Sequence, residues 1–408
     1  MTMSNNQVVL IENGITFSPY YFYTEFLGKL VSCYNESNGD NPVISYKLTD
    51  DMDPFMGKYR IDPISLPLLL SLSQQLKRNQ NSAIRLDLSN YPATTKLLEF
   101  LYRSDFFCVA GNEKNPNFPS GKDLLSYDKR YIGGFSNGNI RPEHKLRCYS
   151  INDEPLLNAI ISSNISEDEK RDYFIEHYSY KVYEHFDALL RESTGDFVSL
   201  YVDILSELIT NGIIHSGSDV FALMFSDKYS IKFSISDSGI GLYDSLDKKE
   251  SNIYYEKFDL TKKILKKTKL PTNTLTKSLV AIYETLFYSM VKKRLGLFDL
   301  MVNVVNQYSG YFRLHNECSQ VIFSPRLSRE LKSLETIRVG IRNLYFKSEG
   351  EVDFGAEIKK MILEGEDLFL ELFQSTLKKY SEDVKFSAIR TFNVRLKGVH
   401  IEVEIPKQ

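Results

Sequence analysis

Three groups of residues in the middle of this 408-residue sequence have the types and spacing that binding or catalysis requires. The first lies in the segment SELITNGIIHS, where Glu207, Asn211 and His215 recur at every fourth position and so share one stripe of a helix. A carboxylate and a carboxamide one turn apart could hold a water and a hard cation together, because Mg²⁺ prefers a few oxygen ligands and keeps several waters. The alternative is a solvated helix face that ends in a histidine.

The second group is the segment DSGIG, which contains Asp237, Gly239 and Gly241 and follows an alternating apolar and polar run. A carboxylate at a strand end can accept a hydrogen bond from an exocyclic amino group. Paired glycines let the backbone approach a flat ligand closely. The alternative is an ordinary Gly-rich turn.

The third group is the segment RLGL, with Arg294, Gly296 and Leu297, just before a helix expected at Phe298 to Gln307. A glycine at a helix N-terminus, followed by backbone N–H groups without intrahelical partners, favours phosphate binding. Taken alone, such a segment is also typical of a plain helix start.

The pattern around these groups predicts the elements that must position them. A helix is expected at about Asp196 to Ser216 with Gly217 as its stop, after a longer helix opened by a capping box of Ser166 and Glu169. Alternation and apolar runs predict strands at residues 219–225, 231–236, 311–315, 320–324 and 399–405. In the strand at 231–236, alternate residues are expected to face opposite sides.

The rest of the chain is expected to surround this central part as separate pieces. Strands at 43–48 and 83–88 alternate with helices at 64–78 and 93–104, which predicts a small α/β module in residues 1–110. Residues 111–150 are expected to be a loop or linker, because the stretch 111–139 is dense in Gly, Asn, Pro and Ser. Residues 151–408 then form the main domain.

Composition narrows the class of protein. Fifty basic and fifty-three acidic residues leave a net charge of −3, which excludes a polycation that coats nucleic acid. The start of the chain has no basic n-region, and no apolar run approaches the roughly 20 residues that a bilayer span needs. We therefore expect a cytoplasmic protein that does not enter a membrane. Four widely spaced cysteines, expected to be buried or free thiols, show no metal-ligand spacing: Cys33, Cys108, Cys148 and Cys318.

Taken in order, the three groups resemble the N, G1 and G2 boxes of the GHKL ATPase superfamily, which includes DNA gyrase, the heat-shock ninety chaperones, histidine kinases and MutL. The resemblance spans about Asp196 to Ser324, and the ending LKGVHIEVEIP is similar to the superfamily's closing strand. It implies an α+β fold with a Bergerat-type ATP site, a mixed sheet with helices on one side. The N-terminal module loosely resembles the STAS-type modules that accompany some stand-alone GHKL proteins.

The resemblance also implies a role for each residue. Glu207 would activate the attacking water, and Asn211 would hold Mg²⁺. Asp237 would receive the adenine amino group. The other residues that the resemblance places around ATP are His215, Gly239, Gly241, Arg294, Gly296 and Leu297.

Residues 242–295 would form the ATP lid, and their charge is unusual. From Leu242 to Arg294 the sequence holds twelve Lys or Arg against six acids. Such a lid could stabilise a triphosphate or touch an anionic partner. The alternative is a solvated helix face, because several lysines recur at i, i+4.

Residues 326–390 interrupt the path to the last strand as an inserted helical piece, with helical patterns at 356–363 and 368–379. Its apolar residues exceed what one helix face needs, so we expect that they either pack on their own domain or cover a partner. These residues are Ile358, Met361, Ile362, Leu368, Leu370, Leu372 and Phe373.

Three functions stay open. The first is a Mg²⁺-dependent ATPase that acts as a conformational switch on a protein partner, such as a STAS-like protein or an effector encoded nearby. The second is an anti-sigma-type Ser/Thr kinase that phosphorylates a STAS-like partner. The third is a nucleotide-gated binding module without hydrolysis. A homodimer is a further option, and nucleic acid binding through the basic lid is a less favoured one.

Overall fold

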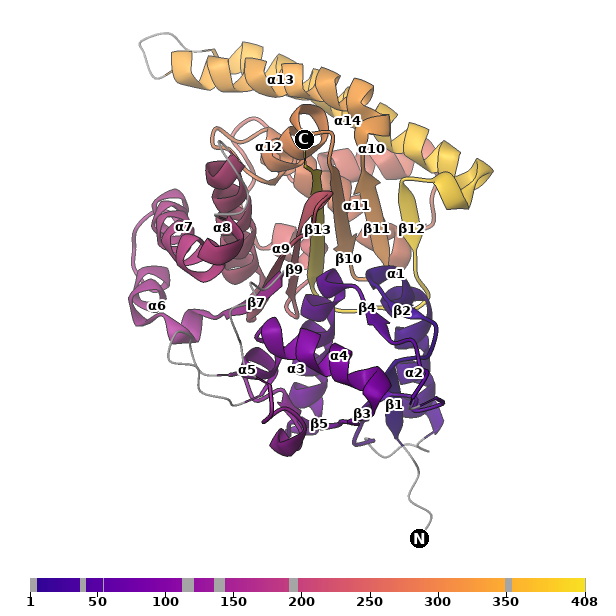
Figure 1. Cartoon of the computed structure of the whole chain (residues 1–408). Helices are drawn as coiled ribbons and strands as arrows, with labels where there is room; N and C mark the ends of the chain where they lie inside the picture. Colours follow the sequence, from indigo (N-terminus) through magenta and orange to yellow (C-terminus); the bar gives the residue numbers. More distant parts are fainter. Residues whose placement is uncertain are drawn as a thin grey trace. The chain divides into compact units, whose positions relative to one another are not determined.

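The chain is an α+β protein in which helices and strands are interspersed along the sequence (Figure 1). The computed structural model describes residues 6–36, 42–53, 55–111, 121–135, 144–190, 197–348 and 354–407. Two compact units divide it: residues 1–228 with 232–238, and residues 229–231 with 239–408. The main division therefore follows Asp237 and Ser238, within a segment that we expected to belong to one domain.

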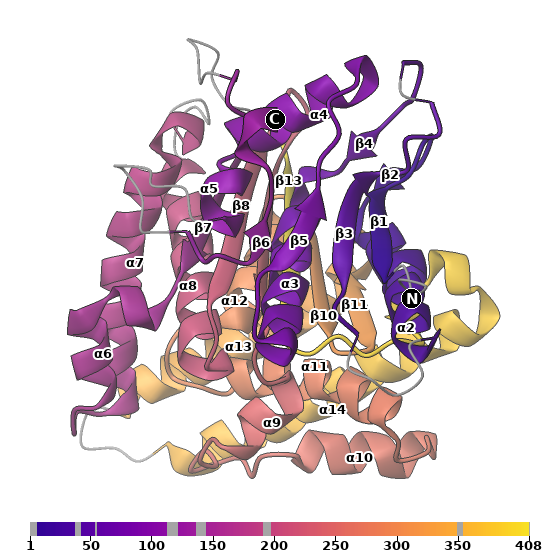
Figure 2. The same ribbon diagram turned by 90° about the horizontal axis from the view of Figure 1, so that it is seen from below.

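The first unit contains a parallel sheet of order β1-β3-β5-β6 (Figure 2). Its strands are β1 (Gln7–Ile11), β3 (Ser45–Thr49), β5 (Ile84–Asp87) and β6 (Leu125–Ser126). The strands and helices expected in the first 110 residues are present within a few residues of their predicted limits. The helices of this module are α2 (Leu27–Glu36), α3 (Leu66–Gln80), α4 (Pro92–Arg103) and α5 (Phe106–Ala110).

Short elements complete this module. Thr16–Phe17 (β2) pairs in parallel with Arg60–Ile61 (β4), and a short helix at Pro19–Tyr21 (α1) continues as a π-helix at Phe22–Phe26. Stacked and edge-to-face rings of the π-helix pack in the core with Phe17. Single 3₁₀ turns lie at Pro63–Ser65, Lys129–Tyr131 and Ile151–Asp153.

A second group of strands in the first unit has the order β9-β8-β7. These are β7 (His144–Tyr149), β8 (Val220–Ser226) and β9 (Ser230–Asp237), with β7 antiparallel to β8. Both β6 and β7 lie inside the segment 111–150, so the prediction of a continuous loop or linker there was wrong for them. The two-residue strand β6 lies inside the turn-rich stretch 111–139, and the short strand β7 follows that stretch with few apolar residues of its own.

Helix α3 packs on β8, and residues of the same N-terminal module also contact β9, in which nearly all side chains are buried. The side chains of Ser234 and Ser236 are almost completely buried, although the alternation placed them on a polar face. Ser234 donates a hydrogen bond to the carbonyl of Ile64, 2.6 Å away. Small hydroxyl side chains let the N-terminal module approach the strand closely while their polar atoms stay satisfied.

Helices α7 (Glu167–Leu190) and α8 (Phe197–Ser216) lie side by side in the first unit (Figure 1), after the short α6 (Pro155–Ile161). The capping box before α7 is confirmed, because the Glu169 amide donates to Ser166 Oγ at 3.2 Å and the Ser166 amide donates to the Glu169 carboxylate at 3.0 Å. Gly217, with φ of +65°, ends α8 in the left-handed conformation that favours glycine.

The second unit contains the strand order β12-β11-β10-β13. Its strands are β10 (Tyr311–Asn316), β11 (Ser319–Phe323), β12 (Ile389–Thr391) and β13 (Val399–Pro406), and all pair antiparallel. The closing strand is thus present at its predicted place. The preceding helices are α9 (Leu242–Asp247), α10 (Asp259–Thr268), α11 (Thr274–Met290) and α12 (Leu297–Val302), which continues as a π-helix at Asn303–Gln307.

The inserted helical piece of the second unit is a pair of long neighbouring helices, α13 (Ser328–Lys347) and α14 (Gly355–Glu382), seen together in Figure 1. The two helical patterns predicted at 356–363 and 368–379 belong to one continuous helix. Its apolar side chains pack within the described part of their own unit, so the reading in which they cover a partner finds no support in their burial. Those that are fully buried are Ile358, Ile362, Leu370, Leu372 and Phe373. Two 3₁₀ turns flank this pair, at Pro325–Leu327 and Val384–Phe386.

Among the described residues, we find no helix that combines the length and the apolar character needed to cross a membrane.

Candidate functional site

The predicted stripe of Glu207 and Asn211 on α8 is not a solvated helix face, because both side chains have partners within the protein. Arg171 on α7 reaches across to it, donating one hydrogen bond to Asn211 Oδ1 at 2.9 Å and forming an ion pair with the Glu207 carboxylate. Asn211 Nδ2 in turn donates to Glu207 Oε1 at 3.1 Å. The three side chains form a closed triangle, which we call the Arg171 cluster. The side chains of Arg171 and Glu207 keep 17% and 14% of their surface exposed, so the cluster stays accessible to a small ligand.

His215, the third residue of the predicted stripe, lies in the last turn of α8 and is half-buried. The structure thus brings Glu207 and Asn211 into contact and places His215 two turns from Glu207 on the same helix. Close packing sets the position of α8 on the sheet: a Cβ at Gly212 would lie 2.6 Å from a methyl group of Val220 on β8. A larger residue at this position would push α8 away from the strand.

The oxygen atoms that the Arg171 cluster could offer as metal ligands do not suit Mg²⁺. The Asn211 carboxamide has a single oxygen, and that oxygen already accepts a hydrogen bond from Arg171. A dication at this oxygen would also lie beside a guanidinium. That guanidinium repels a cation, and the Glu207 carboxylate in the same cluster attracts it, so the occupied oxygen of Asn211, and not the net charge, is what disfavours a metal. In the described parts of the chain, no group of three His, Cys, Asp or Glu residues could hold a metal either.

Asp237 ends β9 as the sequence predicts, and only 7% of its surface is exposed. Two side chains of α3 fix the turn that follows it. Ser71 Oγ donates to the Asp237 carbonyl at 2.7 Å, and the Ser238 hydroxyl donates to Gln74 Oε1. Gln74 also donates to Asp219 Oδ2 at 2.5 Å, on the segment just before β8.

Sequence reasoning missed both Ser71 and Gln74. They lie three residues apart on α3, whose face toward the core is otherwise rich in leucine. Both are buried, and polar residues inside a run of leucines are the one signal in the sequence that could have shown them. Together they hold the end of β9 in one place.

Gly239 and Gly241 lie in the second unit. Gly241 is the N-cap of α9, and a Cβ there would lie 3.0 Å from Asn316 Oδ1. The same oxygen accepts the amide of Leu242 at 3.0 Å. Close packing between the start of α9 and the end of β10 is therefore sufficient to explain the glycine, without a ligand.

Gly296 is the N-cap of α12, and Leu297 is the first residue of that helix. The amide of Gly296 donates to Asp299 Oδ2 at 2.9 Å, and the amide of Phe298 donates to Ser289 Oγ at 3.1 Å. These contacts lie within the second unit, and the helix itself has only six residues. Two of the N–H groups predicted to face phosphate are thus used by the protein.

Arg294 precedes this helix start, and its carbonyl accepts a hydrogen bond from Arg338 on α13 at 2.6 Å. Arg338 is 2% exposed and forms a forked ion pair with Asp299, with N–O distances of 2.8 and 3.0 Å. It also donates to the carbonyls of Met290, at 2.7 Å, and of Lys292. We call this set the Arg338 cluster. It fixes the loop between α11 and α12 from the inserted helical pair.

The segment 242–295, predicted to be the lid, contains the largely buried helix α11 of the second unit. Most side chains of α11 are buried, and Glu284 in its middle accepts four hydrogen bonds from Tyr255, Phe258 and Thr261. This packing anchors the middle of the segment, and the assignment of 242–295 as a lid stays a prediction. The basic residues concentrate on and around α10, where Lys263 bridges Glu366 and Asp367 of α14.

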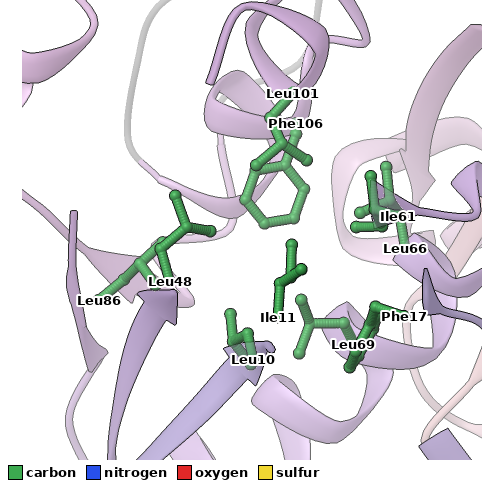
Figure 3. A pocket seen from close by; sticks show the side chains of 10 residues that line it. All are labelled: Leu10, Ile11, Phe17, Leu48, Ile61, Leu66, Leu69, Leu86, Leu101 and Phe106. Carbon is green, nitrogen blue, oxygen red and sulfur yellow. The ribbon is translucent and has the colours of Figure 1, made fainter. Parts of the chain in front are cut away.

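An apolar cavity lies in the first unit at the carboxyl ends of β1, β3 and β5, as Figure 3 shows. No polar side chain lines it, so it offers no partner for phosphate or for a base edge. It is therefore not the candidate nucleotide site. Its lining residues are Leu10, Ile11, Phe17, Leu48, Ile61, Leu66, Leu69, Leu86, Leu101 and Phe106.

Comparison with known proteins gives no match to a protein family, to a curated protein or to a solved structure.

Proposed function

We propose that the chain binds ATP and acts as a nucleotide-dependent conformational switch on a protein partner, as a member of the GHKL superfamily with a Bergerat-type fold. The observation that carries the proposal is the run α8–β8–β9 in the first unit. A helix with Glu207 and Asn211 in contact is followed by two neighbouring strands, and the second strand ends in the buried Asp237. These are the element types and the order that the resemblance requires.

The support around Asp237 favours a binding role for its carboxylate. Ser71 holds the Asp237 carbonyl and Gln74 holds the side chain of the next residue, Ser238, so the end of β9 needs little reorganisation when the carboxylate accepts a hydrogen bond from a ligand. An adenine amino group is the partner that the resemblance assigns to it. A preorganised acceptor discriminates well against bases that lack this donor.

Among the functions left open by the sequence, the geometry favours binding over rapid turnover. The Glu207 carboxylate, which would take a proton from the attacking water, is paired with Arg171. A base must reach that proton within hydrogen-bonding distance, so Glu207 would first have to leave its ion pair with Arg171. ATPase activity and transfer of phosphate to a Ser or Thr of a partner remain the second and third candidates.

The first prediction concerns adenine. Asp237→Asn should lower ATP affinity about 10- to 100-fold, the scale of one hydrogen bond to a charged group. It should also abolish any preference for ATP over ITP, which lacks the amino group. Calorimetric titration of both nucleotides measures this, and Asp203→Asn, an exposed carboxylate on α8, is the control. Unchanged ATP affinity in a folded Asp237→Asn protein would remove the adenine assignment.

Incubation of the intact chain and candidate partners with γ-labelled ATP separates the three activities. Bound nucleotide with neither free phosphate nor labelled protein supports the gated binding module. Released phosphate supports the ATPase, and labelled partner supports the kinase.

A further inference from the structure

We propose that Arg171 supplies the positive charge that a metal ion brings to the phosphates in the superfamily, so that this chain binds ATP without Mg²⁺. The inference rests on the proposed function and specifies the cation of the same site. It follows from the mismatch between the Arg171 cluster and a metal.

Arg171 holds both of the groups that would otherwise serve a metal. Its guanidinium occupies the Asn211 oxygen at 2.9 Å and is paired with Glu207. The bond from Asn211 to Glu207 at 3.1 Å closes the triangle and fixes the carboxamide with its oxygen toward Arg171. A metal at that oxygen would have to compete with the guanidinium that already donates to it.

The guanidinium also has capacity left for a ligand. It carries five N–H donors in a planar fork, and within the described residues it makes two hydrogen bonds. Phosphate oxygens match that fork, which is why arginine binds phosphates in pairs of parallel bonds. The partial exposure of the side chain gives a phosphate access to the remaining donors.

The charge of the cluster is consistent with this role. Glu207 pairs with Arg171 before a ligand arrives, so the guanidinium is not left without a partner in the half-buried cluster. A phosphate that approaches can share the guanidinium with Glu207, and Asn211 keeps the arginine in place during the exchange. The alternative role is a purely structural link between α7 and α8, which would leave the metal dependence of binding untouched.

The experiment is titration of the full chain with ATP, once in excess Mg²⁺ and once in EDTA. For the unmodified protein, we expect the two dissociation constants to agree within about threefold, because the charge at the phosphates comes from the protein. In EDTA, Arg171→Gln should weaken ATP binding about 10- to 100-fold, the loss of a charged hydrogen bond. Adenosine, which has no phosphate, should bind both proteins equally.

Lys181→Gln is the matched control. Lys181 lies on the same helix and faces Glu154, with 3.9 Å between the charged atoms, and the substitution removes the same charge away from α8. It should leave ATP binding unchanged. Arg171→Lys keeps the charge without the fork, and we expect it to fall between the parent and Arg171→Gln.

Three outcomes would overturn the inference. If the unmodified protein binds ATP only with Mg²⁺, the metal is required, although the proposed function stands. If Arg171→Gln weakens adenosine as much as ATP, the arginine is a structural link. If ATP binds in neither buffer, the proposed function itself fails, and the inference falls with it. Should Arg171→Gln not fold, the two titrations of the unmodified protein still decide the metal question.

Discussion

Two arginines, one in each unit, are held in opposite ways. Arg338 is sealed in the second unit, 2% exposed, and its donors go to the Asp299 carboxylate and to three main-chain carbonyls. Arg171 in the first unit is partly exposed, and its donors go to two side chains, Glu207 and Asn211. A main-chain carbonyl can move only if the backbone around it moves, whereas a side-chain acceptor can rotate away from its donor.

This difference separates an arginine that shapes the protein from one that can serve a ligand. Arg338 joins the α11–α12 loop to α13, and loss of any of these contacts leaves a buried polar group without a partner. In the proposed site, the Arg171 cluster would exchange one side-chain acceptor for a phosphate. We therefore expect replacement of Arg338 to lower the stability of the protein, and replacement of Arg171 to affect ligand binding more than stability.

Arg338→Gln should have the largest effect on stability. It leaves the half-buried Asp299 carboxylate without its charge partner and three main-chain carbonyls without their donor, a combined loss of about 3–5 kcal/mol. Chemical denaturation of the full chain measures the loss. Glu335→Gln, which weakens a hydrogen bond of 2.8 Å from Asn306 to the same helix α13, should cost about 1 kcal/mol or less. A loss below that control for Arg338→Gln would show that its cluster is as exchangeable as that of Arg171.

Acid should weaken the helix that carries Arg171, because His185 on that helix is partly buried and resists protonation in the folded chain. Burial, with Arg147 and Lys181 nearby, lowers the pKa of His185 on α7 to about 3. The unfolded chain takes up that proton near pH 6.5 and the folded chain only near pH 3, so stability falls as the pH falls through this window. From about pH 7 to about pH 5 the loss is about 2 kcal/mol for this histidine.

Hydrogen exchange of the α7 amides at the two pH values measures this effect after correction for intrinsic rates. In His185→Gln, which can keep the contact of 3.1 Å with the Tyr149 hydroxyl, the part of the pH dependence due to His185 should disappear. An unchanged pH dependence in that variant would place the acid-sensitive group elsewhere.

Much of the fold was predictable, because element type follows from local patterns. Helix α8 and strands β8, β9, β10, β11 and β13 lie within one or two residues of their predicted limits. The strands β6 and β7 were not predicted, because turn-forming residues surround them. The burial of Ser234 and Ser236 also escaped, since alternation shows that two faces differ but not what covers the second face.

Contacts of the candidate site within one helix could be predicted from the sequence, whereas contacts between different helices and strands could not. The contact between Glu207 and Asn211 follows from i, i+4 spacing on one helix. Arg171 lies 36 residues before Glu207, and Ser71 lies 166 residues before Asp237. No periodicity links positions so far apart, and only the packing of α7 on α8 and of α3 on the sheet brings them together.

The smallest effect on stability is expected from the ion pair between Arg171 and Glu207. A double-mutant cycle of Arg171→Gln and Glu207→Gln, without nucleotide, should give a coupling free energy of about 1 kcal/mol, because both side chains keep some exposure to water. High salt should reduce it, since the solvent-accessible side of the pair is screened. Thermal or chemical unfolding of the four proteins measures the coupling. A coupling as large as the loss in Arg338→Gln, and insensitive to salt, would mean that Arg171 is locked like Arg338 and has no donor to offer a phosphate.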